Sequence, residues 1–557
     1  MDLHSALHDT VCARQHSCPV TMPMKRPAFS PLALSALVAL YLLAAFNAGF
    51  WRTAVLLFGD RPVTLALFVI AIAALTVFLT LLGGFRWLHR AWLVFLILCG
   101  TGASFYADRL GVIIDQDMIQ NLFNTQPAEA GHMLTPALAG FVVIWGVLPS
   151  ALVVAVRVRR KRVLVDLLLW PLSAAVAAVI GLGALMMDYQ SFSSTFRQHR
   201  ELMSQFLPAA PMNDALRYLA RVNAAAALPM VPLGLDATRG HILTAERPLL
   251  LVLVIGETAR AQNWGLNGYA RDTTPELRDR EVINFTDVTS CGTSTAISVP
   301  CLFSVYGQND YSYERRLSTE NLLDVLSHAG LDVLWWENNA GHYGIADRVL
   351  FRQMTAADDA EACVMGECTD AVFLRPLTDL AATITRDTVV VLHSIGSHGP
   401  AYSLRYPPTR EVFSPACGDV DFQHCTPDAI INAYDNTLAF TDHVLAQITD
   451  ILGAHSQLST AMLYVSDHGE SLGENGLYLH GSPWFMAPEV QTRVPMVMWL
   501  SPALQTAFGV DQACRDRLTW AALSHDWIFH TVLGLADVAT NVRDPALDLT
   551  ALCAPRG

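Results

Sequence analysis

Residues 461–470 read Ala-Met-Leu-Tyr-Val-Ser-Asp-His-Gly-Glu, a short apolar run that ends in a cluster of polar side chains. An apolar run bounded by polar residues and glycine is typical of a buried strand. The adjacent Asp467 and His468 offer a carboxylate oxygen and an imidazole nitrogen, and zinc accepts both. In open α/β sheets, ligands lie beyond the carboxyl ends of the strands. A single Asp-His pair is more often a loop hydrogen bond, so the neighbouring strands decide the interpretation.

Apolar strand-like runs alternate with amphipathic stretches from residue 247 onward. Alternation of this type indicates a mostly parallel sheet covered by helices. The clearest predicted helices are Leu322–Ala329 and Ile430–Leu452. The predicted strands are Pro248–Ile255, Leu331–Trp336, Thr388–Leu392, Ala461–Val465 and Val494–Leu500.

Three of these predicted strands end in side chains that bind metals. The polar residues are Glu257 after the first strand, His393 and His398 after the third, and Asp467 and His468 after the fourth. Because parallel strands bring their carboxyl ends to one edge of a sheet, we expect these residues to converge there. Two carboxylates and an imidazole form a divalent-metal site with one position open for a reacting group.

A group of hydroxyl residues offers a nucleophile. Residues 291–301 read Cys-Gly-Thr-Ser-Thr-Ala-Ile-Ser-Val-Pro-Cys, which resembles a loop that opens a helix. A hydroxyl at a helix start meets the positive end of the helix dipole, and metal coordination would lower its pKa. Simple N-capping is the commoner role of such residues. The residues alone leave Thr293, Ser294 and Thr295 open, and His480, beside Gly481, is a further candidate ligand.

The composition indicates a membrane protein with two or three domains. Of the 557 residues, 52% are hydrophobic and only 15% are charged, whereas soluble proteins carry about a quarter charged residues. The net charge of −14 argues against nucleic acid as a partner. The apolar runs lie within residues 28–186 and approach the ~20 residues that a bilayer requires. The five predicted spans are Pro31–Phe50, Val63–Gly84, Ala91–Tyr106, Ala137–Val156 and Val163–Met186.

Basic residues predict the orientation of these spans. They cluster before the first span, after the second and after the fourth, which places the N-terminus in the cytoplasm. An odd number of spans then places residues 188–557 outside. We therefore predict a cytoplasmic tail (1–27), a transmembrane domain (28–187), a periplasmic linker with amphipathic helices (188–246) and a periplasmic catalytic domain (247–557).

The spacing of the cysteines supports an exterior location for residues 188–557. Closely spaced pairs suit loop-stapling disulfides in an oxidising compartment such as a bacterial periplasm. The alternative, a zinc cluster of thiolates, has no Cys-x2-Cys spacing to support it. Cys514 and Cys553 could form a fourth bridge or stay free. The three predicted pairs are Cys291 with Cys301, Cys363 with Cys368, and Cys417 with Cys425.

Five motifs in the same order resemble the lipid A phosphoethanolamine transferases, a family that includes the mobile colistin resistance enzymes. The resemblance covers roughly residues 30–540, with the five spans and the three cysteine pairs. The motifs are Ile-Gly-Glu-Thr-Ala-Arg at 255–260, the segment Cys291–Cys301, Ser-His-Gly-Pro-Ala-Tyr at 397–402, Ile-Asn-Ala-Tyr-Asp-Asn at 431–436 and Ser-Asp-His-Gly-Glu at 466–470.

The resemblance implies an N-terminal five-helix transmembrane domain and a C-terminal α/β domain like those of alkaline phosphatases and sulfatases. It implies that Thr295 is the nucleophile that becomes phosphoethanolaminylated. It also implies His398 and His480 as ligands of the donor phosphate or of a second zinc ion. The residues implied to hold the first zinc ion are Glu257, Thr295, Asp467 and His468.

The resemblance further implies a site for the ethanolamine headgroup, formed by Asn121, Thr125, Glu129 and Asn339. The first three are spaced i, i+4 and i+8, which would align them on one helix face. Pro127 interrupts that helix, so Glu129 could instead lie in the first turn of a second helix.

The sequence departs from the family pattern after Asn338-Asn339. The family has a lysine nearby where this chain has Tyr343, and the two lysines of the chain, Lys25 and Lys161, lie outside the predicted exterior. The charge of a phosphate must then be met by zinc, by a histidine such as His342, or by an arginine. This departure bears on acceptor choice and rate rather than on reaction class.

As a member of this family, the chain is expected to be a monomer in the bacterial inner membrane that lowers the negative charge of lipopolysaccharide and gives polymyxin resistance. Its expected donor is phosphatidylethanolamine and its expected acceptor is a phosphate of lipid A. The alternatives are a phosphoglycerol transferase, a phosphatase or sulfatase that releases product to water, and a sensor that keeps the fold without activity.

Overall fold

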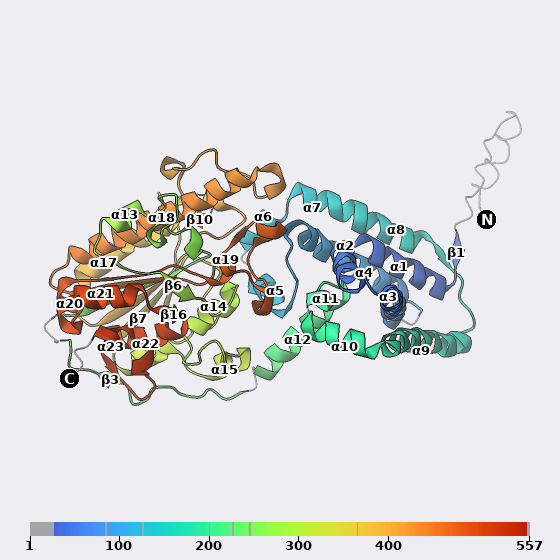
Figure 1. The fold of residues 1–557 in the computed structure, drawn as a ribbon, viewed down its shortest axis with the longest axis horizontal. Helices are drawn as coiled ribbons and strands as arrows, with labels where there is room; N and C mark the ends of the chain where they lie inside the picture. The colour runs from blue at the N-terminus through green and yellow to red at the C-terminus, as the bar shows by residue number, and fades with distance from the viewer. Residues whose placement is uncertain are drawn as a thin grey trace, which may run out of the picture. The chain divides into compact units, whose positions relative to one another are not determined.

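The computed structural model describes residues 27–83, 86–124, 127–199, 201–225, 228–243, 247–364 and 366–553. The predicted cytoplasmic tail lies outside these residues, except for Pro27. The chain divides into two compact units (Figure 1). Among the described residues, the first unit takes those within 27–45, 61–98 and 143–191, and the second takes those within 46–60, 99–142 and 192–553.

Long apolar helices make up the first unit. Helix α3 (Pro62–Leu82) has 21 residues and is therefore about 31 Å long, enough to cross the hydrocarbon core of a bilayer. It packs along α9 (Val163–Met187). Gly181 of α9 lies close against α3, because a Cβ atom there would come within 2.8 Å of the Leu75 side chain. Among the described residues, the helices long and apolar enough to span a membrane are Pro62–Leu82, Leu88–Leu110 (α4), Pro136–Ala155 and Val163–Met187.

The predicted first span, Pro31–Phe50, falls on two helices that are bent at a break. The chain forms α1 (Pro31–Ala45) and α2 (Ala48–Phe58), which are bent by 77° relative to each other. The break coincides with Asn47, whose side-chain amide donates to the Leu207 carbonyl and accepts from the Leu207 N–H, both at 2.9 Å. A buried amide that bonds to a distant backbone satisfies its polar groups outside the helix. Five spans result only if this bent pair counts as one.

A seven-stranded sheet forms the centre of the second unit. All five predicted strands are confirmed, and each pairs in a mostly parallel sheet. The last predicted strand, β15, runs antiparallel to β12. The two edge strands, which have only three and four residues, were not predicted. The order is β5 (Ile283–Phe285), β15 (Met496–Leu500), β12 (Ser459–Ser466), β4 (Leu249–Gly256), β11 (Thr388–His393), β7 (Asp332–Glu337) and β8 (Leu350–Gln353).

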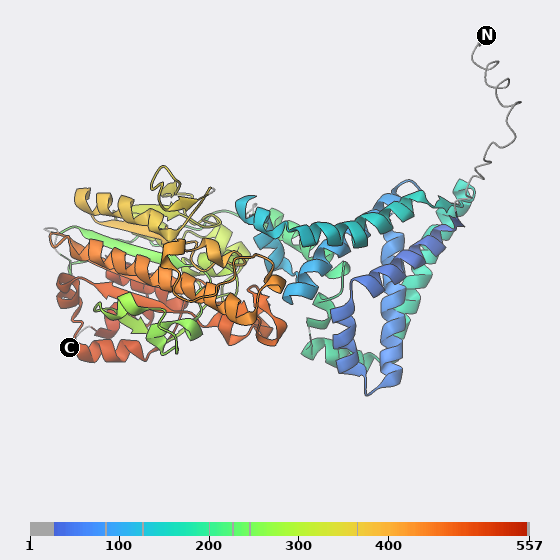
Figure 2. The ribbon, with the colours of Figure 1, turned by 90° about the horizontal axis from the view of Figure 1, so that it is seen from above.

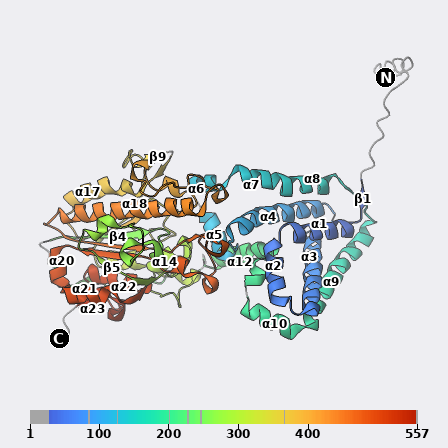
Figure 3. The same ribbon diagram turned by 45° about the horizontal axis from the view of Figure 1, so that its top comes forward.

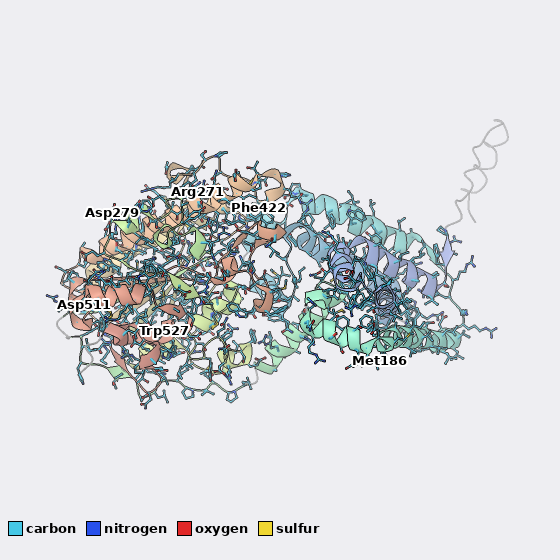
Figure 4. The ribbon with its side chains drawn as sticks, viewed as in Figure 1. Met186, Arg271, Asp279, Phe422, Asp511 and Trp527 are labelled. Carbon is cyan, nitrogen blue, oxygen red and sulfur yellow. A yellow bond between two sulfur atoms is a disulfide. The ribbon has the colours of Figure 1, made fainter. Side chains whose placement is uncertain are left out.

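Each face of the sheet is covered by helices and has its own apolar core. Strand β4 is buried throughout, and alternate residues point to opposite faces, as the pleat requires. Leu251 and Leu253 belong to one core and Val252 to the other. Trp527, labelled in Figure 4, packs against the first core. That face is covered by α16 (Leu322–His328), α20 (Pro502–Phe508), α21 (Gln512–Thr519) and α22 (Asp526–Leu535).

Helices α17 (Leu374–Thr383) and α18 (Pro427–Gly453) cover the opposite face, as Figures 1 and 3 show. Figure 2 shows them side by side from above. The predicted helices Leu322–Ala329 and Ile430–Leu452 are confirmed, with α18 extending further at its N-terminal end because Thr426 caps it and Pro427 starts it. The fold class is therefore an α/β domain preceded by apolar helices.

Disulfides staple the loops of this α/β domain. The three predicted pairs are confirmed, because bonds join Cys291 to Cys301, Cys363 to Cys368, and Cys417 to Cys425. Cys514 and Cys553, which the sequence left open, form a fourth bridge that joins α21 to α23 (Leu549–Cys553). Among the described residues, Cys99 is the free cysteine.

Asp442 of α18 holds a neighbouring short helix to the domain. Its carboxyl accepts hydrogen bonds from the backbone N–H groups of Glu276 at 2.8 Å and Leu277 at 2.9 Å, at the start of α13 (Pro275–Arg278). Burial raises the pKa of this carboxyl to about 7. The folded chain thus binds this proton more tightly than the unfolded chain does.

This raised pKa predicts a pH-dependent stability. The contribution of Asp442 is fully present below its ordinary pKa of 3.8 and is lost as the pH rises to about 7. We expect the free energy of unfolding of the parent to fall relative to that of Asp442→Asn across this window, by at most about 1.4 kcal/mol per pH unit. The melting temperature of the parent should fall with it. Thermal unfolding of the full chain in detergent at pH 4.5, 6 and 8 measures this. A difference that does not change with pH would contradict it.

Candidate active site

The register of the central strands brings three predicted site segments together. Gly256 at the end of β4 pairs with Ser466 at the end of β12, and Ile255 pairs with His393 at the end of β11. The residues that follow β4 and β12, Glu257 and Asp467, therefore leave the sheet side by side. The convergence predicted for the carboxyl edge is observed.

Glu257, Asp467 and His468 form a compact buried cluster. One ligand atom from each lies within 4.8 Å of those of the other two. Their exposed fractions are 1%, 0% and 0%. Thr258 fixes both carboxylates, because its hydroxyl donates to Glu257 and its N–H donates to Asp467 Oδ1 at 3.0 Å. To do this, Thr258 adopts a φ of +61°, which non-glycine residues rarely take and which marks functional sites.

Thr295 is the hydroxyl residue that faces this cluster. It begins α14 (Thr295–Leu302), and its Oγ1 lies 3.1 Å from Glu257 Oε2 and 3.3 Å from His468 Nε2. Among the described residues, neither of the other two candidates bonds to the cluster. Thr293 donates to the carbonyl of Ser482 at 2.7 Å, and the Ser294 hydroxyl has no hydrogen-bond partner among the described residues.

The two carboxyl groups of the cluster have pKa values that are shifted in opposite directions. Burial alone would raise the pKa of Glu257, but the imidazoles of His468, His398 and His480 hold it at about 2. Burial and the charge of Glu257 raise the pKa of Asp467 well above its usual range. Asp467 Oδ2 is also buried without a hydrogen-bond partner among the described residues. Two oxygens and one nitrogen in a dry site with an unsatisfied carboxylate fit a divalent cation.

Two further histidines stand beside the cluster. The ring of His480 lies 4.3 Å from that of His468 and 5.7 Å from that of His398, measured between ring centres. Glu470 Oε2 holds His480 through Nδ1 at 2.9 Å and so fixes the orientation of the ring. Burial, followed by the nearby His480, lowers the pKa of His468 to about 3, so His468 is neutral and suited to bind a metal.

Of the two histidines that the sequence left open after β11, His393 turns away from the cluster. It is fully buried, and its Nδ1 pairs with Glu337 Oε1 at 2.9 Å, at the end of β7. Glu337 Oε1 also accepts from the N–H of Asn339 at 2.8 Å. The Asn339 amide in turn donates to Glu257 Oε2 at 2.7 Å. Asn339 therefore orients a cluster carboxylate, and its predicted contact with a headgroup stays a prediction.

The predicted headgroup residues are only partly described. Asn121 lies in α5 (Gln116–Asn124), which packs against α14 (Figure 1). Its neighbour Gln120 donates to the carbonyl of Ala296 at 3.0 Å, one residue after Thr295. Thr125 and the side chain of Glu129 lie outside the described residues. The backbone confirms that Pro127 begins a second helix, α6 (Pro127–Met133), with Glu129 in its first turn.

Several residues that support the site lie in the motifs quoted above, but the sequence did not predict their supporting role. Tyr434 is fully buried in α18; its hydroxyl donates to the Thr258 carbonyl at 2.8 Å and accepts from the Arg260 N–H at 2.9 Å. Ser466 accepts from the Ala259 N–H at 2.8 Å. Asp435 binds Arg271, which is labelled in Figure 4. An apolar helix pattern interrupted by Tyr-Asp-Asn is the signal that could have identified Tyr434 and Asp435.

Comparisons with known proteins match both parts of the chain. The family model described as Sulfatase matches residues 250–538, and the one described as Phosphoethanolamine transferase EptA/EptB matches residues 71–222. The chain is 35% identical to phosphoethanolamine transferase EptA of Escherichia coli K12, over 95% of this chain and 98% of that protein. It is 36% identical to phosphatidylethanolamine transferase Mcr-1 of Escherichia coli, over 93% and 97% of the two chains.

A solved structure matches nearly the whole chain as well. The integral membrane protein lipooligosaccharide phosphoethanolamine transferase A of Neisseria meningitidis superposes with a TM-score of 0.90 at 32% identity. The match covers 95% of this chain and 99% of that one. It therefore extends over the apolar helices as well as the α/β domain.

The close packing of Gly396 on Glu257 predicts a sensitive position. A Cβ atom on Gly396 would lie 2.6 Å from the Glu257 carbonyl oxygen and 3.0 Å from its Cβ, and Gly396 has a φ of +46°. We expect Gly396→Ala to displace Glu257 and to weaken divalent-metal binding about 10–100-fold, as changes beside metal ligands do. Competition with a chelator measures the affinity. Gly418→Ala, which meets nothing within 4 Å, is the matched control; equal affinities of the two variants would contradict the prediction.

Proposed function

Because the chain belongs to the family of EptA- and Mcr-type phosphoethanolamine transferases, we propose that it transfers phosphoethanolamine from phosphatidylethanolamine to a phosphate of lipid A through Thr295, at a zinc site. The observation that carries this proposal is the position of Thr295 Oγ1, at 3.1 Å from Glu257 and 3.3 Å from His468 inside the buried cluster. A hydroxyl in that place can form a phosphate ester and be released again.

Glu257, Asp467 and His468 would hold the zinc ion, with Thr295 as the fourth ligand. Bound zinc supplies a lowered pKa of the threonine hydroxyl and screening of the phosphate charge. The chain itself contributes the rest. Thr258 and Asn339 fix the carboxylates, so little reorganisation is required when a phosphate arrives.

The first displacement transfers the donor group to the enzyme. Thr295 Oγ1 attacks the phosphorus of phosphatidylethanolamine, a Thr295–phosphorus ester bond forms, and the bond to the diacylglycerol oxygen breaks. The proton that the Thr295 hydroxyl loses is balanced by the one that the leaving oxygen takes up, and diacylglycerol leaves. His398 and His480 stand beside the cluster and would bind the phosphate oxygens, or a second zinc ion. Asn121, Thr125 and Glu129 would contact the ethanolamine group.

The second displacement reverses the role of the threonine. A phosphate oxygen of the acceptor attacks the same phosphorus, the ester bond to Thr295 breaks, and a diphosphate linkage forms on the glycolipid. The positive end of the α14 dipole lies at Thr295, where it stabilises the negative charge that returns to Oγ1. The threonine is thus restored for the next cycle.

Two lipid substrates account for the apolar helices that precede the α/β domain. In this proposal the N-terminus lies in the cytoplasm and the α/β domain lies in the periplasm, next to the outer leaflet of the inner membrane. Four disulfides in the α/β domain suit that oxidising compartment. A cationic amine added to an anionic phosphate would weaken the binding of cationic peptides such as polymyxin.

The nucleophile can be identified by mass. Incubation of the purified chain with phosphatidylethanolamine is expected to add one phosphoethanolamine group to the peptide that contains Thr295. We expect Thr295→Ala to lose this adduct and Thr293→Ala, two residues away, to keep it, because the Thr293 hydroxyl points to Ser482. Tandem mass spectrometry locates the adduct. An adduct on another residue, or on none, would reject Thr295 as the nucleophile.

The acceptor can be identified in cells. Expression of the parent chain in a polymyxin-sensitive bacterium is expected to add phosphoethanolamine to lipid A and to raise the inhibitory concentration of polymyxin several-fold. Cells that express Thr295→Ala at the same level should show neither change. Mass spectrometry of lipid A gives the first result. Unmodified lipid A in cells that make active enzyme would overturn the acceptor assignment.

A further inference from the structure

A small cavity lies at the far end of the helix that carries the nucleophile. It has a volume of about 60 Å³ and lies beside the C-terminal half of α14, α15 (Tyr313–Ser318) and the segment 343–348. We call it the arginine pocket, because three arginines line it. Its defining residues are Pro300, Ser304, Arg315, Arg316, Tyr343 and Arg348.

Two of the three arginines are engaged with carboxylates. Arg348 makes a bidentate pair with Asp324, with both contacts at 2.6 Å. Arg315 lies 3.6 Å from Asp310. Two acids, Glu320 and Asp347, also line the pocket. Glu320 accepts from the Leu233 N–H at 2.9 Å and pairs with His328, and Asp347 lies 3.6 Å from His342. The charges of these two arginines and these acids are therefore met by partners of opposite charge or by hydrogen bonds.

Arg316 is different. Among the described residues no carboxylate lies within 4.0 Å of its guanidinium, which donates to the Tyr343 carbonyl and lies 4.7 Å from the centre of the Tyr313 ring. Its Nε–H group is buried without a hydrogen-bond partner among the described residues. A buried donor without a partner is rare and calls for an explanation, such as an absent ligand. A guanidinium matches phosphate or carboxylate oxygens in a two-point geometry.

The arginine pocket lies close to the proposed nucleophile but is separate from it. Pro300 is five residues beyond Thr295 in α14, about 7.5 Å along the helix. Tyr343 is four residues beyond Asn339, so the chain allows at most about 14 Å between them. Asn339 in turn bonds to Glu257. These spacings keep the arginine pocket near the cluster, at a separation that an acceptor with two anionic groups could span.

We propose that the arginine pocket binds a second anionic group of the acceptor, a phosphate or carboxylate that is not itself modified. This inference rests on the proposed function, because it names a subsite for the acceptor of that reaction. Tyr343 stands where the family pattern has a lysine, and the chain beyond Lys161 contains no lysine. Arg316 supplies a fixed positive charge bonded to the Tyr343 backbone itself.

The test separates acceptor binding from the donor reaction. The parent and Arg316→Gln, as full chains in detergent, are compared with an acceptor that carries two phosphates and with its singly phosphorylated counterpart. We expect Arg316→Gln to raise the KM for the doubly phosphorylated acceptor about tenfold, the loss of one charged hydrogen bond, and to leave the other KM unchanged. The rate at which Thr295 gains phosphoethanolamine should not change. Arg316→Lys keeps the positive charge but loses the paired N–H donors of the guanidinium. Its KM for the doubly phosphorylated acceptor should lie between those of the parent and Arg316→Gln.

Arg386→Gln is the matched control, because Arg386 is an exposed arginine that pairs with Asp332. It should behave like the parent with both acceptors. Equal effects of Arg316→Gln on the two acceptors, or a slower gain of phosphoethanolamine on Thr295, would overturn the proposal. Direct binding of the two acceptors to Thr295→Ala, with and without Arg316→Gln, repeats the comparison without turnover. A binding preference there with no adduct on Thr295 in the parent would reject the proposed function and keep the pocket.

Discussion

Two carboxylates that the sheet forces together in a dry site are the constraint on which the rest of the α/β domain depends. Strands β4 and β12 are parallel neighbours in register up to Gly256 and Ser466, so Glu257 and Asp467 leave the sheet at the same point. Both side chains are buried, and like charges in a dry site repel strongly. A positive charge would relieve this repulsion, and because His468 is neutral, the proposed cation is the group that would supply it.

The surrounding residues keep this arrangement rigid. Thr258 takes a positive φ to reach both carboxylates, and Tyr434 of α18 holds the two ends of that turn through one hydroxyl. On the other side, Glu337 and His393 form a buried pair that places Asn339 on Glu257. Hydrogen bonds on both sides therefore connect the core to the site. Such pre-positioned groups are what phosphoryl transfer requires, because the reaction gains mainly from positioning and charge.

The sequence could predict those features that depend on pattern. Fully apolar runs identified all five inner strands, and the chemistry after each run identified Glu257, Asp467 and His468. Patterns could not choose between Thr293, Ser294 and Thr295, because the direction of a side chain at a helix start depends on its tertiary contacts. They also missed the bend at Asn47, whose partner Leu207 is 160 residues away. Edge strands of three or four residues carry too little pattern to stand out.

The shortage of lysine in this chain changes how it can handle anions. Lysine is a flexible point charge, whereas the guanidinium of arginine is planar and offers paired donors, so an arginine in a folded domain is readily taken up by a carboxylate. Arg260 with Glu474, Arg271 with Asp435 and Arg348 with Asp324 are examples. A domain whose arginines are mostly engaged in this way retains few fixed charges for a ligand. Arg316, held by a carbonyl and an aromatic ring instead, keeps its charge for one.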